Sequence, residues 1–424
     1  MTILILGANG FVGSAVLARL ARDGHVLAGL GRDIVHAKNR FPSVRWHRAD
    51  LSGLKSVEGW APYLDGVEVV VNCAGALQDG QRDDVVATQR DAMLALYQAA
   101  RKSGLRLVVQ ISARTDRGQD LPFLSTKAEA DMALAASGLD HVILRPALVL
   151  GRNAHGGSAL LRALAALPFV TPLAFSDRRV ETVSVEDVAE CVHEAIEGRL
   201  PSGTDVDLAA DAPDLGKLVA LHRAWLGLPP AKTLALPDAI AAPVSRLADL
   251  AGRLGWRSPL RSTAMQVMAG GIAAGETRLD RPLSSARETL VRNPAGVQDL
   301  WFARLYLAKP VLIVTLALFW ILSGLVPFLD LGRAAAHFAP FMPQAAALGL
   351  TAATSLLDIV LGLLLLWRPT ARIALVGQAA LALAYLAGGT LLEPALWLDP
   401  LGPYVKVLPA LALTLTTLAL LDER

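Results

Sequence analysis

The chain has 424 residues, enough for about two or three domains, and a formal net charge of +2. So small a charge excludes the basic field that nucleic-acid binding requires, and we expect no nucleic-acid partner. The hydrophobic fraction is 53%, high for a soluble enzyme, and the last 120 residues contain only 12 charged ones. The sequence therefore predicts that the chain passes from water into an apolar environment near residue 305.

The first residues predict a strand followed by a phosphate-binding turn. Thr2–Leu6 is a short apolar run without a charged leader, which favours a first buried strand over a signal peptide. A glycine-rich turn follows, and Ser14–Arg22 has helical spacing. In this context glycines allow a tight turn, close approach to a pyrophosphate and close helix–strand packing. The expected dinucleotide contacts here are Gly7, Asn9, Gly10, Phe11, Val12 and Gly13.

The next elements continue an alternation of strands and helices. Further strands are expected at Val26–Leu30, Val44–Arg48, Val67–Asn72, Leu105–Ile111 and His141–Leu144, and later helices at Arg82–Lys102 and Ser125–Ala136. Such alternation predicts an α/β doubly wound parallel sheet of the Rossmann type, with the ligand at the carboxyl ends of the strands. We expect this domain to occupy residues 1–150, with later elements reaching about residue 200.

The residue after the second expected strand bears on the choice of nucleotide. An Asp or Glu near this position would hold the ribose 2′-hydroxyl of NAD, but the chain has Gly31-Arg32. An arginine can pair with a 2′-phosphate, so NADP(H) is favoured over NAD(H). Two alternatives stay open: Arg32 faces only solvent, or the neighbouring Asp33 takes the acidic role.

Several motifs occur in the order found in the extended and atypical short-chain dehydrogenase/reductase families, which residues 1–300 resemble. The glycine turn is similar to the family fingerprint, and Lys127 to the lysine of its YxxxK motif. The resemblance implies an adenine contact at Asp50 and Leu51, cofactor contacts at Ala74, Gly75, Lys127 and Pro146, and catalytic roles for Ser112 and Lys127. Val185–Ala189 also resembles a segment found later in such chains.

The chain departs from this family at its proton donor. The tyrosine position, four residues before Lys127, holds Phe123, and the sequence has no tyrosine between Tyr97 and Tyr306. A phenyl ring donates no proton. Three interpretations remain: nucleotide binding without turnover, hydride transfer with another acid, or hydride transfer to an acceptor that needs no side-chain proton. The alternative acids are Asp116, Asp120 and a water held by Ser112.

The middle of the chain carries little chemical signal. We expect residues 151–300 to form a small, helix-rich substrate lobe that begins with the loop Gly151–Gly157. His155 in this loop is expected to be a surface residue. His193 lies on an expected helix with Cys191 and Glu194 but without a second pair of ligands, so we expect no metal site. The chain's two cysteines, Cys73 and Cys191, cannot form a disulfide framework, which fits a reducing compartment.

The last 120 residues predict four membrane helices, which we assign to a domain at 305–424. Pro310–Leu329 and Ile373–Leu392 lack charges over 20 residues, about the length that spans a bilayer. The other two are Ala345–Trp367 and Leu401–Leu421. Arg368 and Arg372 lie in one short loop, which the positive-inside rule places in the cytoplasm. With four spans, both termini are then cytoplasmic, as expected for a bacterial inner-membrane protein.

Two ionisable residues of this block are candidate functional groups. Asp358 lies mid-span, where it should face the bundle, pair with Lys406 or Arg372, or be protonated. A structural hydrogen bond between helices stays open as the alternative to a functional role. Lys406 lies near one end of its span.

The motifs around Asp358 and Lys406 resemble the DoxX-like four-helix membrane domains. These are fused behind short-chain dehydrogenase domains in bacteria and have suggested links to quinones. The resemblances imply an NAD(P)H-dependent oxidoreductase with a lipid-soluble, quinone-like substrate and a respiratory or quinone-related membrane partner. The alternative is a non-catalytic module similar to the accessory subunit of respiratory complex I.

Overall fold

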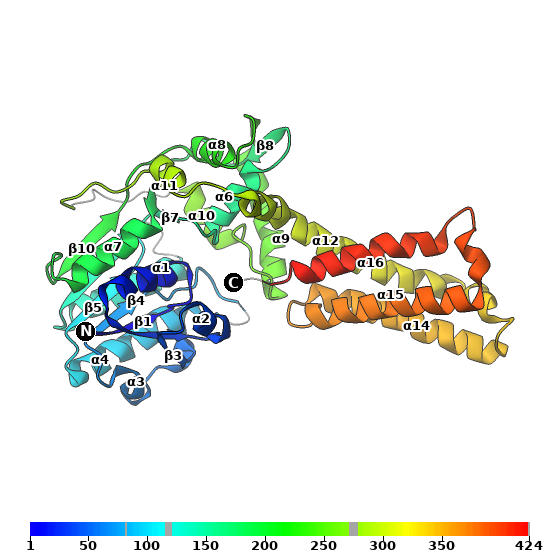
Figure 1. Ribbon diagram of the computed structural model, residues 1–424, viewed down its shortest axis with the longest axis horizontal. Coiled ribbons are helices and arrows are strands. Elements are labelled where there is room, and N and C mark those ends of the chain that lie inside the picture. Colours follow the sequence, from blue (N-terminus) through cyan, green and yellow to red (C-terminus); the bar gives the residue numbers. More distant parts are fainter. Residues whose placement is uncertain (81–82, 115–120, 271–278, 423–424) are drawn as a thin grey trace. The chain divides into compact units, whose positions relative to one another are not determined.

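The computed structural model describes residues 1–80, 83–114, 121–270 and 279–422 (Figure 1). They form two compact units: Met1–Leu250 with Ser258–Arg304, and Ala251–Arg257 with Leu305–Arg424. The acids considered at Asp116 and Asp120 lie outside the described residues.

The first unit contains a seven-stranded parallel sheet in the order β10-β6-β5-β4-β1-β2-β3. The strands are β1 (Thr2–Leu6), β2 (Val26–Gly31), β3 (Arg45–Arg48), β4 (Val69–Asn72), β5 (Leu107–Ile111), β6 (His141–Pro146) and β10 (Thr204–Leu208). The chain winds outward from β1 in one direction and then from β4 in the other. The predicted doubly wound fold is confirmed, and the direction reverses between β1 and β4, where such folds bind ligands.

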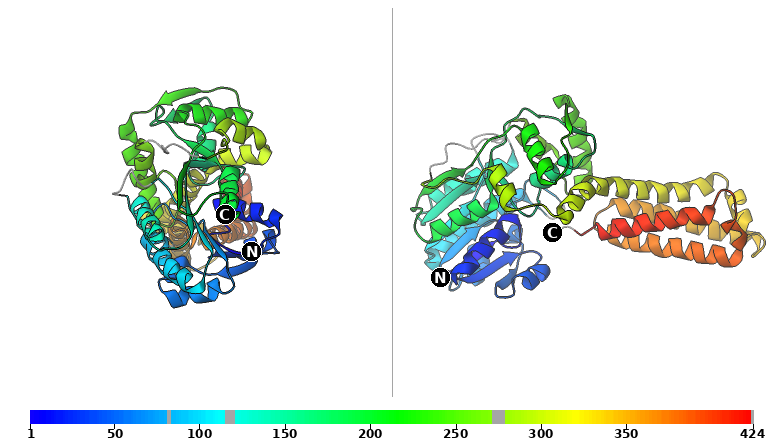
Figure 2. Two further views of the ribbon diagram at one scale, coloured as in Figure 1. Left: turned by 90° about the vertical axis from the view of Figure 1, so that its left-hand side faces the viewer. Right: turned by 45° about the horizontal axis from the view of Figure 1, so that its top comes forward.

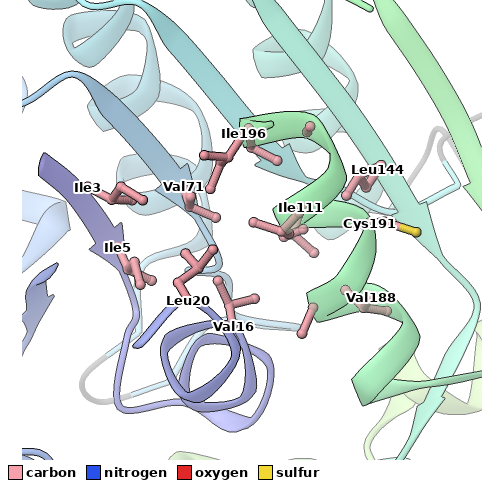
Figure 3. Close-up of a cluster of buried hydrophobic side chains, with 14 of the residues drawn as sticks. Ile3, Ile5, Val16, Leu20, Val71, Ile111, Leu144, Val188, Cys191 and Ile196 are labelled. Carbon is pink, nitrogen blue, oxygen red and sulfur yellow. The ribbon is translucent and has the colours of Figure 1, made fainter. Parts of the chain in front are cut away.

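Helices cover both faces of this sheet (Figures 1 and 2). Because alternate residues of a strand point to opposite faces, Ile3 and Ile5 pack beneath α1 (Phe11–Leu20) and α7 (Val185–Ile196). Figure 3 shows this cluster, in which Ile3 and Ile5 pack together with Val16, Leu20 and Val188. Leu4 and Leu6 join the opposite core, formed with α3 (Val57–Leu64), α4 (Ala92–Ser103) and α5 (Pro122–Ala135). A π-helical turn, Ala87–Asp91, precedes α4.

The structure differs from the expected element list at β10. All six expected strands are present, but the seventh comes from the segment 151–300 that the sequence assigned to the lobe. The residues of β10, Thr-Asp-Val-Asp-Leu, alternate polar and apolar because β10 is an edge strand with one covered face. The long apolar runs that identified the central strands are therefore absent from it.

The remaining elements of this unit form a smaller cluster with its own core around Leu161, Leu173 and Leu218. Its helices are α6 (Gly157–Ala165), α8 (Leu215–Trp225), α10 (Ser262–Ala269) and α11 (Ala286–Arg292), with α9 (Ala241–Arg253) leading out of it. Its strands form two parallel pairs, β7 (Leu148–Leu150) with β9 (Thr182–Ser184), and β8 (Val170–Leu173) with β11 (Lys232–Ala235).

The second unit is built from apolar helices. Among the described residues, three helices are long and apolar enough to cross a membrane: α12 (Val297–Leu329), α14 (Gln344–Leu366) and α15 (Ala371–Leu392). The fourth expected span forms α16 (Pro403–Ala419), an apolar helix of 17 residues, shorter than expected. Apolar side chains such as those of Val311, Ile373 and Leu391 face outward, as they would toward lipid.

The backbones of α12 and α14 approach each other closely. A Cβ atom on Gly324 would overlap the carbonyl oxygen of Ser355, and one on Gly362 would lie 2.9 Å from the carbonyl oxygen of Ala317. Small residues that let helix backbones touch are typical of helix association in membranes. At one end of the bundle, Trp256 donates its indole N–H to the carbonyl oxygen of Leu366 over 2.7 Å.

Candidate dinucleotide site and membrane-domain carboxylate

The turn after β1 has the geometry that its glycines predict. Gly7 has a φ of +67° and carries no side chain that would press on Ala74, whose Cα would lie 3.0 Å from a Cβ. A Cβ on Gly13 would overlap the carbonyl oxygen of Gly7. Both glycines are therefore required by the backbone path, which brings the turn after β1 close to the loop after β4.

The N-terminus of α1 opens onto this turn. Gly10 is its N-cap and has no side chain to cap the helix, and its first turn contains no acidic residue. The backbone N–H groups at this end, those of Phe11 and Val12 among them, have no partner within the helix, and they can bind phosphate oxygens. The Phe11 ring stacks with that of His155 at 6.2 Å between centroids. His155, expected at the surface, is exposed and lies beside the turn.

The end of β2 forms the side of the site expected to hold the adenosine. Asn9 donates from Nδ2 to the carbonyl oxygen of Asp33 over 2.7 Å, which ties the glycine turn to this strand. Arg32 follows β2, its side chain is 43% exposed, and its Nη2 lies 2.7 Å from Oδ1 of Asp83. Arg32, the residue expected to meet a ribose 2′-phosphate, thus has an acidic partner in this structure.

The expected adenine contacts lie after β3. The Asp50 carboxylate accepts hydrogen bonds from N and Oγ of Ser52, at 3.1 and 2.9 Å, and so caps the short turn Leu51–Gly53. Leu51 is buried. Asp50 therefore shapes the backbone here and is exposed to solvent.

Lys127 lies at the opposite end of the candidate site, beside the loop after β4. Its ammonium group is buried and donates to the carbonyl oxygen of Ile111 over 2.9 Å. A Cβ on Gly75 would lie 3.7 Å from its Nζ, and the neighbouring Ala74 N–H is held by the side chain of Asn72. The structure thus brings together Ala74, Gly75 and Lys127, three of the expected cofactor contacts. Pro146, a fourth, ends β6 and pairs in register with Leu208.

Ser112 belongs to a buried polar cluster that the sequence did not reveal. Its Oγ donates to Oδ2 of Asp131 over 2.6 Å, and Nη2 of Arg145 lies 3.2 Å from the same oxygen. Arg145 also pairs with Asp205. Oδ1 of Asp131 is buried without a hydrogen-bond partner among the described residues. The spacing of Lys127 and Asp131, four residues apart on one helix, is the only sequence signal that could have indicated this cluster.

Burial shifts the two ionisable groups of this cluster toward their neutral forms. It raises the pKa of Asp131, against the hydrogen bond from Ser112 and the charge of Arg145. It lowers the pKa of Lys127, against the charge of Asp131. Each charge therefore favours ionisation of the other while the protein interior opposes both.

Phe123 occupies the place of the missing tyrosine. It lies one turn before Lys127 on α5, with its ring centroid 6.0 Å from Nζ. Tyr97 is no substitute, because it is buried in α4, its hydroxyl lies 3.4 Å from the side-chain oxygen of Gln110, and burial raises its pKa. Ser112 points to Asp131. Among the described residues, the end of the candidate site at Lys127 therefore has an ammonium group and a phenyl ring side by side.

In the membrane domain, Asp358 is buried and accepts a hydrogen bond from the hydroxyl of Tyr385 over 3.0 Å. Between described residues, no ion pair joins Asp358 to Lys406 or Arg372, the basic residues considered. Lys406 is exposed on the first turn of α16, and Arg372 pairs with Asp422. Asp358 is thus bound by a phenol from the adjacent helix α15, which satisfies one carboxylate oxygen inside the bundle.

Comparisons with known proteins find a family match in each of the two parts of the chain. Residues 3–209 match the NAD dependent epimerase/dehydratase family, and residues 317–415 match the DoxX-like family. The enzyme WbmH of Bordetella bronchiseptica, solved with NAD⁺, shares the fold at a TM-score of 0.50 and 16% identity, over 72% of this chain and 98% of that one.

Two of the curated relatives match about half of the chain or somewhat less. An uncharacterised protein of Mycobacterium tuberculosis is 29% identical over 213 residues, and a ceramide reductase of Caulobacter vibrioides is 27% identical over 190 residues. The matches cover 50% and 44% of this chain but only 22% and 58% of the relatives' lengths. The chain thus joins an N-terminal NAD-binding Rossmann domain of the epimerase and short-chain dehydrogenase type to a C-terminal DoxX-like membrane domain.

Proposed function

We propose that the protein is a membrane-anchored oxidoreductase that transfers hydride between a nicotinamide dinucleotide, preferentially NADP(H), and a lipid-soluble, quinone-like acceptor. The observation that carries the proposal is Lys127, a buried ammonium group beside Gly75, in a chain that continues into helices able to span a bilayer. A ceramide reductase among the relatives supports a lipid as the substrate class.

The residues present fit a dinucleotide. Gly7 and Gly13 let the turn after β1 fold tightly against its neighbouring backbone, and the uncapped start of α1 can bind the pyrophosphate. At the other end Lys127 can donate to the ribose hydroxyls, because its ammonium group carries three N–H donors and Ile111 takes one of them. A bound nicotinamide would supply or accept the hydride.

The acceptor is inferred from what the site lacks. Reduction of a ketone at this place would need a proton donor, and Phe123 cannot supply one. A quinone takes up two electrons and one proton as hydride, and its second oxygen can be protonated by water after the transfer. This chemistry needs the two reactants to be held in position and needs no phenol, and so favours a quinone-like acceptor over a simple ketone.

The membrane helices and their loops are the basis for a proposed location and topology. We place the protein in a bacterial inner membrane, with the loop containing Arg368 and Arg372 in the cytoplasm, because short loops rich in arginine stay there. With four spans, α16 included, both termini are cytoplasmic. A respiratory or quinone-related partner is part of the same proposal.

The test uses the full chain purified in detergent. NADPH oxidation is followed by absorbance, with and without a soluble quinone. We expect quinone-dependent oxidation in the wild type and at least a tenfold loss in Lys127→Met. Phe123→Tyr serves as the reverse test: with a ketone substrate, a phenol at this place should raise turnover by about 10²-fold or more, the usual contribution of a general acid. Nucleotide binding without oxidation by any acceptor would overturn the proposal.

That outcome would support the second candidate, a nucleotide-binding module without turnover. Phe123 is the observation that favours it, because the site keeps its binding residues and lacks the acid. In this case Lys127→Met would change the affinity for NADPH, and Phe123→Tyr would create no activity.

A further inference from the structure

Two histidines and an aspartate lie close together at the amino end of the strands, the end of the sheet opposite the dinucleotide turn. Asp23 and His25 lie in the turn just before β2, and His193 lies on α7. Their ligand atoms lie within 4.8 Å of one another, and Nδ1 of His193 is 3.1 Å from Oδ2 of Asp23. Because β2 begins at Val26, this cluster lies at the amino end of the strands, while the dinucleotide turn lies at their carboxyl ends.

The imidazole nitrogens are the unusual feature. Nε2 of His25 and Nδ1 of His193 are both buried, and neither has a hydrogen-bond partner among the described residues. His193 is only 8% exposed. A buried polar atom without a partner is destabilising, so native proteins rarely keep two of them side by side. Imidazole nitrogens beside a carboxylate form a donor set that a transition metal ion binds.

A fourth donor is present one helical turn further on. Glu197 follows His193 by four residues on α7, so the two side chains share a face, and its Oε1 lies 3.8 Å from Nε2 of His25. Its side chain is 41% exposed, so it can move toward the cluster. Two imidazoles and two carboxylates are a common donor set for zinc and its neighbours in the periodic table.

The surrounding charges leave room for a cation. Arg19 pairs with Oδ2 of Asp23 at 2.5 Å and with Oε2 of Glu190 at 2.6 Å. Arg199 lies 3.8 Å from the other oxygen of Glu190. Glu190 thus neutralises Arg19, and Oδ1 of Asp23 is left for the metal. The positive charge of Arg19 nevertheless weakens binding, so this site should hold its ion less tightly than a four-cysteine zinc site.

We propose that Asp23, His25, His193 and Glu197 bind a divalent transition metal ion, with Zn²⁺ as the best fit. The ion would join the turn before β2 to α7, segments about 170 residues apart in the chain. Zinc–nitrogen bonds are about 2.0–2.1 Å long, so the donors must close up slightly, and Gly24, with a φ of +72°, allows the turn to do so. The role is structural, because it fixes α7 against the sheet at an edge remote from the hydride.

The sequence alone argued against this site. His193 was assigned to ordinary helix because Cys191 and Glu194 give no second pair of ligands nearby. The second pair comes instead from Asp23 and His25, at the other end of the domain. Only the pairing of α1 and α7 over the same face of the sheet brings these residues together.

The experiment is a Co²⁺ titration of the full chain in detergent, after removal of bound metal with a chelator. Tetrahedral Co²⁺ gives visible absorption, and Zn²⁺ is then added to displace it. We expect one equivalent of Co²⁺ to bind and to be displaced. His25→Gln, which alters a partly exposed side chain, should weaken binding at least tenfold, and His193→Gln should do the same. The matched control is His36→Gln, an exposed histidine on α2 (Val35–Arg40).

Circular dichroism shows whether each variant is folded. No Co²⁺ binding to the folded wild type, or equal binding to wild type and folded His25→Gln, would overturn the proposal. NADPH binding is measured on the same samples. It should be unchanged in His25→Gln, so the result stands apart from the proposed oxidoreductase function.

Discussion

Arg32 provides the sharpest test of nucleotide preference, because its guanidinium pairs with an acidic residue at the end of β2. Its guanidinium lies 2.7 Å from Asp83 and is 43% exposed, at the end of β2 where a 2′-phosphate would be placed. A hydrogen bond to a charged group contributes about 1.5–3 kcal/mol, and solvent exposure brings this to the low end. We therefore expect Arg32→Ala to weaken NADPH binding about tenfold, which corresponds to roughly 1.4 kcal/mol, and to leave NADH binding unchanged.

Asp83 supplies the opposite perturbation. Its carboxylate competes with a phosphate for Arg32 and repels the phosphate itself, so Asp83→Asn should strengthen NADPH binding several-fold. Both variants are measured by titration of nucleotide fluorescence on the full chain, at low and at physiological salt. The difference between them should shrink as salt rises. Equal affinities of the wild type for NADPH and NADH, or an equal loss of both in Arg32→Ala, would refute this reasoning.

Three further predictions address binding, stability and topology. Gly10→Asp should preserve α1, because aspartate is a good N-cap, yet abolish nucleotide binding, because its carboxylate repels phosphate. Gly10→Asn is the uncharged control, and retained nucleotide binding in Gly10→Asp would contradict the assignment. Burial lowers the pKa of His222 from 6.5 to about 4, so the unfolded chain binds a proton at a higher pH than the folded chain does. Lowering the pH from 6.5 to 4 should therefore remove about 3 kcal/mol of the free energy of unfolding. Chemical denaturation would measure this loss, which should be absent in His222→Asn. A reporter fused after Arg424 should be cytoplasmic, and a periplasmic signal would change the number of spans by one.

The central sheet and the cofactor turn could be predicted because their signals are local. Runs such as Thr2–Leu6 are apolar throughout since both faces of the strand are covered, and the spacing of Phe123 and Lys127 lies within one helix. The placement of Gly75 beside Lys127 was expected from the resemblance. These features depend on residues close in sequence or on a recurrent fold.

The features that could not be predicted depend on contacts between distant segments. Asp131 meets Ser112 and Arg145 only because α5 packs across β5 and β6. The partner of Asp358 is Tyr385, and nothing in the sequence distinguishes that phenol from a basic residue as the group that would satisfy a buried carboxylate. Hydrophobic periodicity reports which face is buried, but not which polar groups meet inside.

The glycines of the membrane domain also restrict its motion. At Gly324 and Gly362 a backbone carbonyl oxygen of the neighbouring helix lies against the glycine, so α12 and α14 are expected to move as one body. Between α15 and α16 the close contact at Gly389 is instead with the Tyr404 ring, which can rotate out of the way. Any opening of the bundle to admit a substrate should therefore begin at the α15–α16 seam.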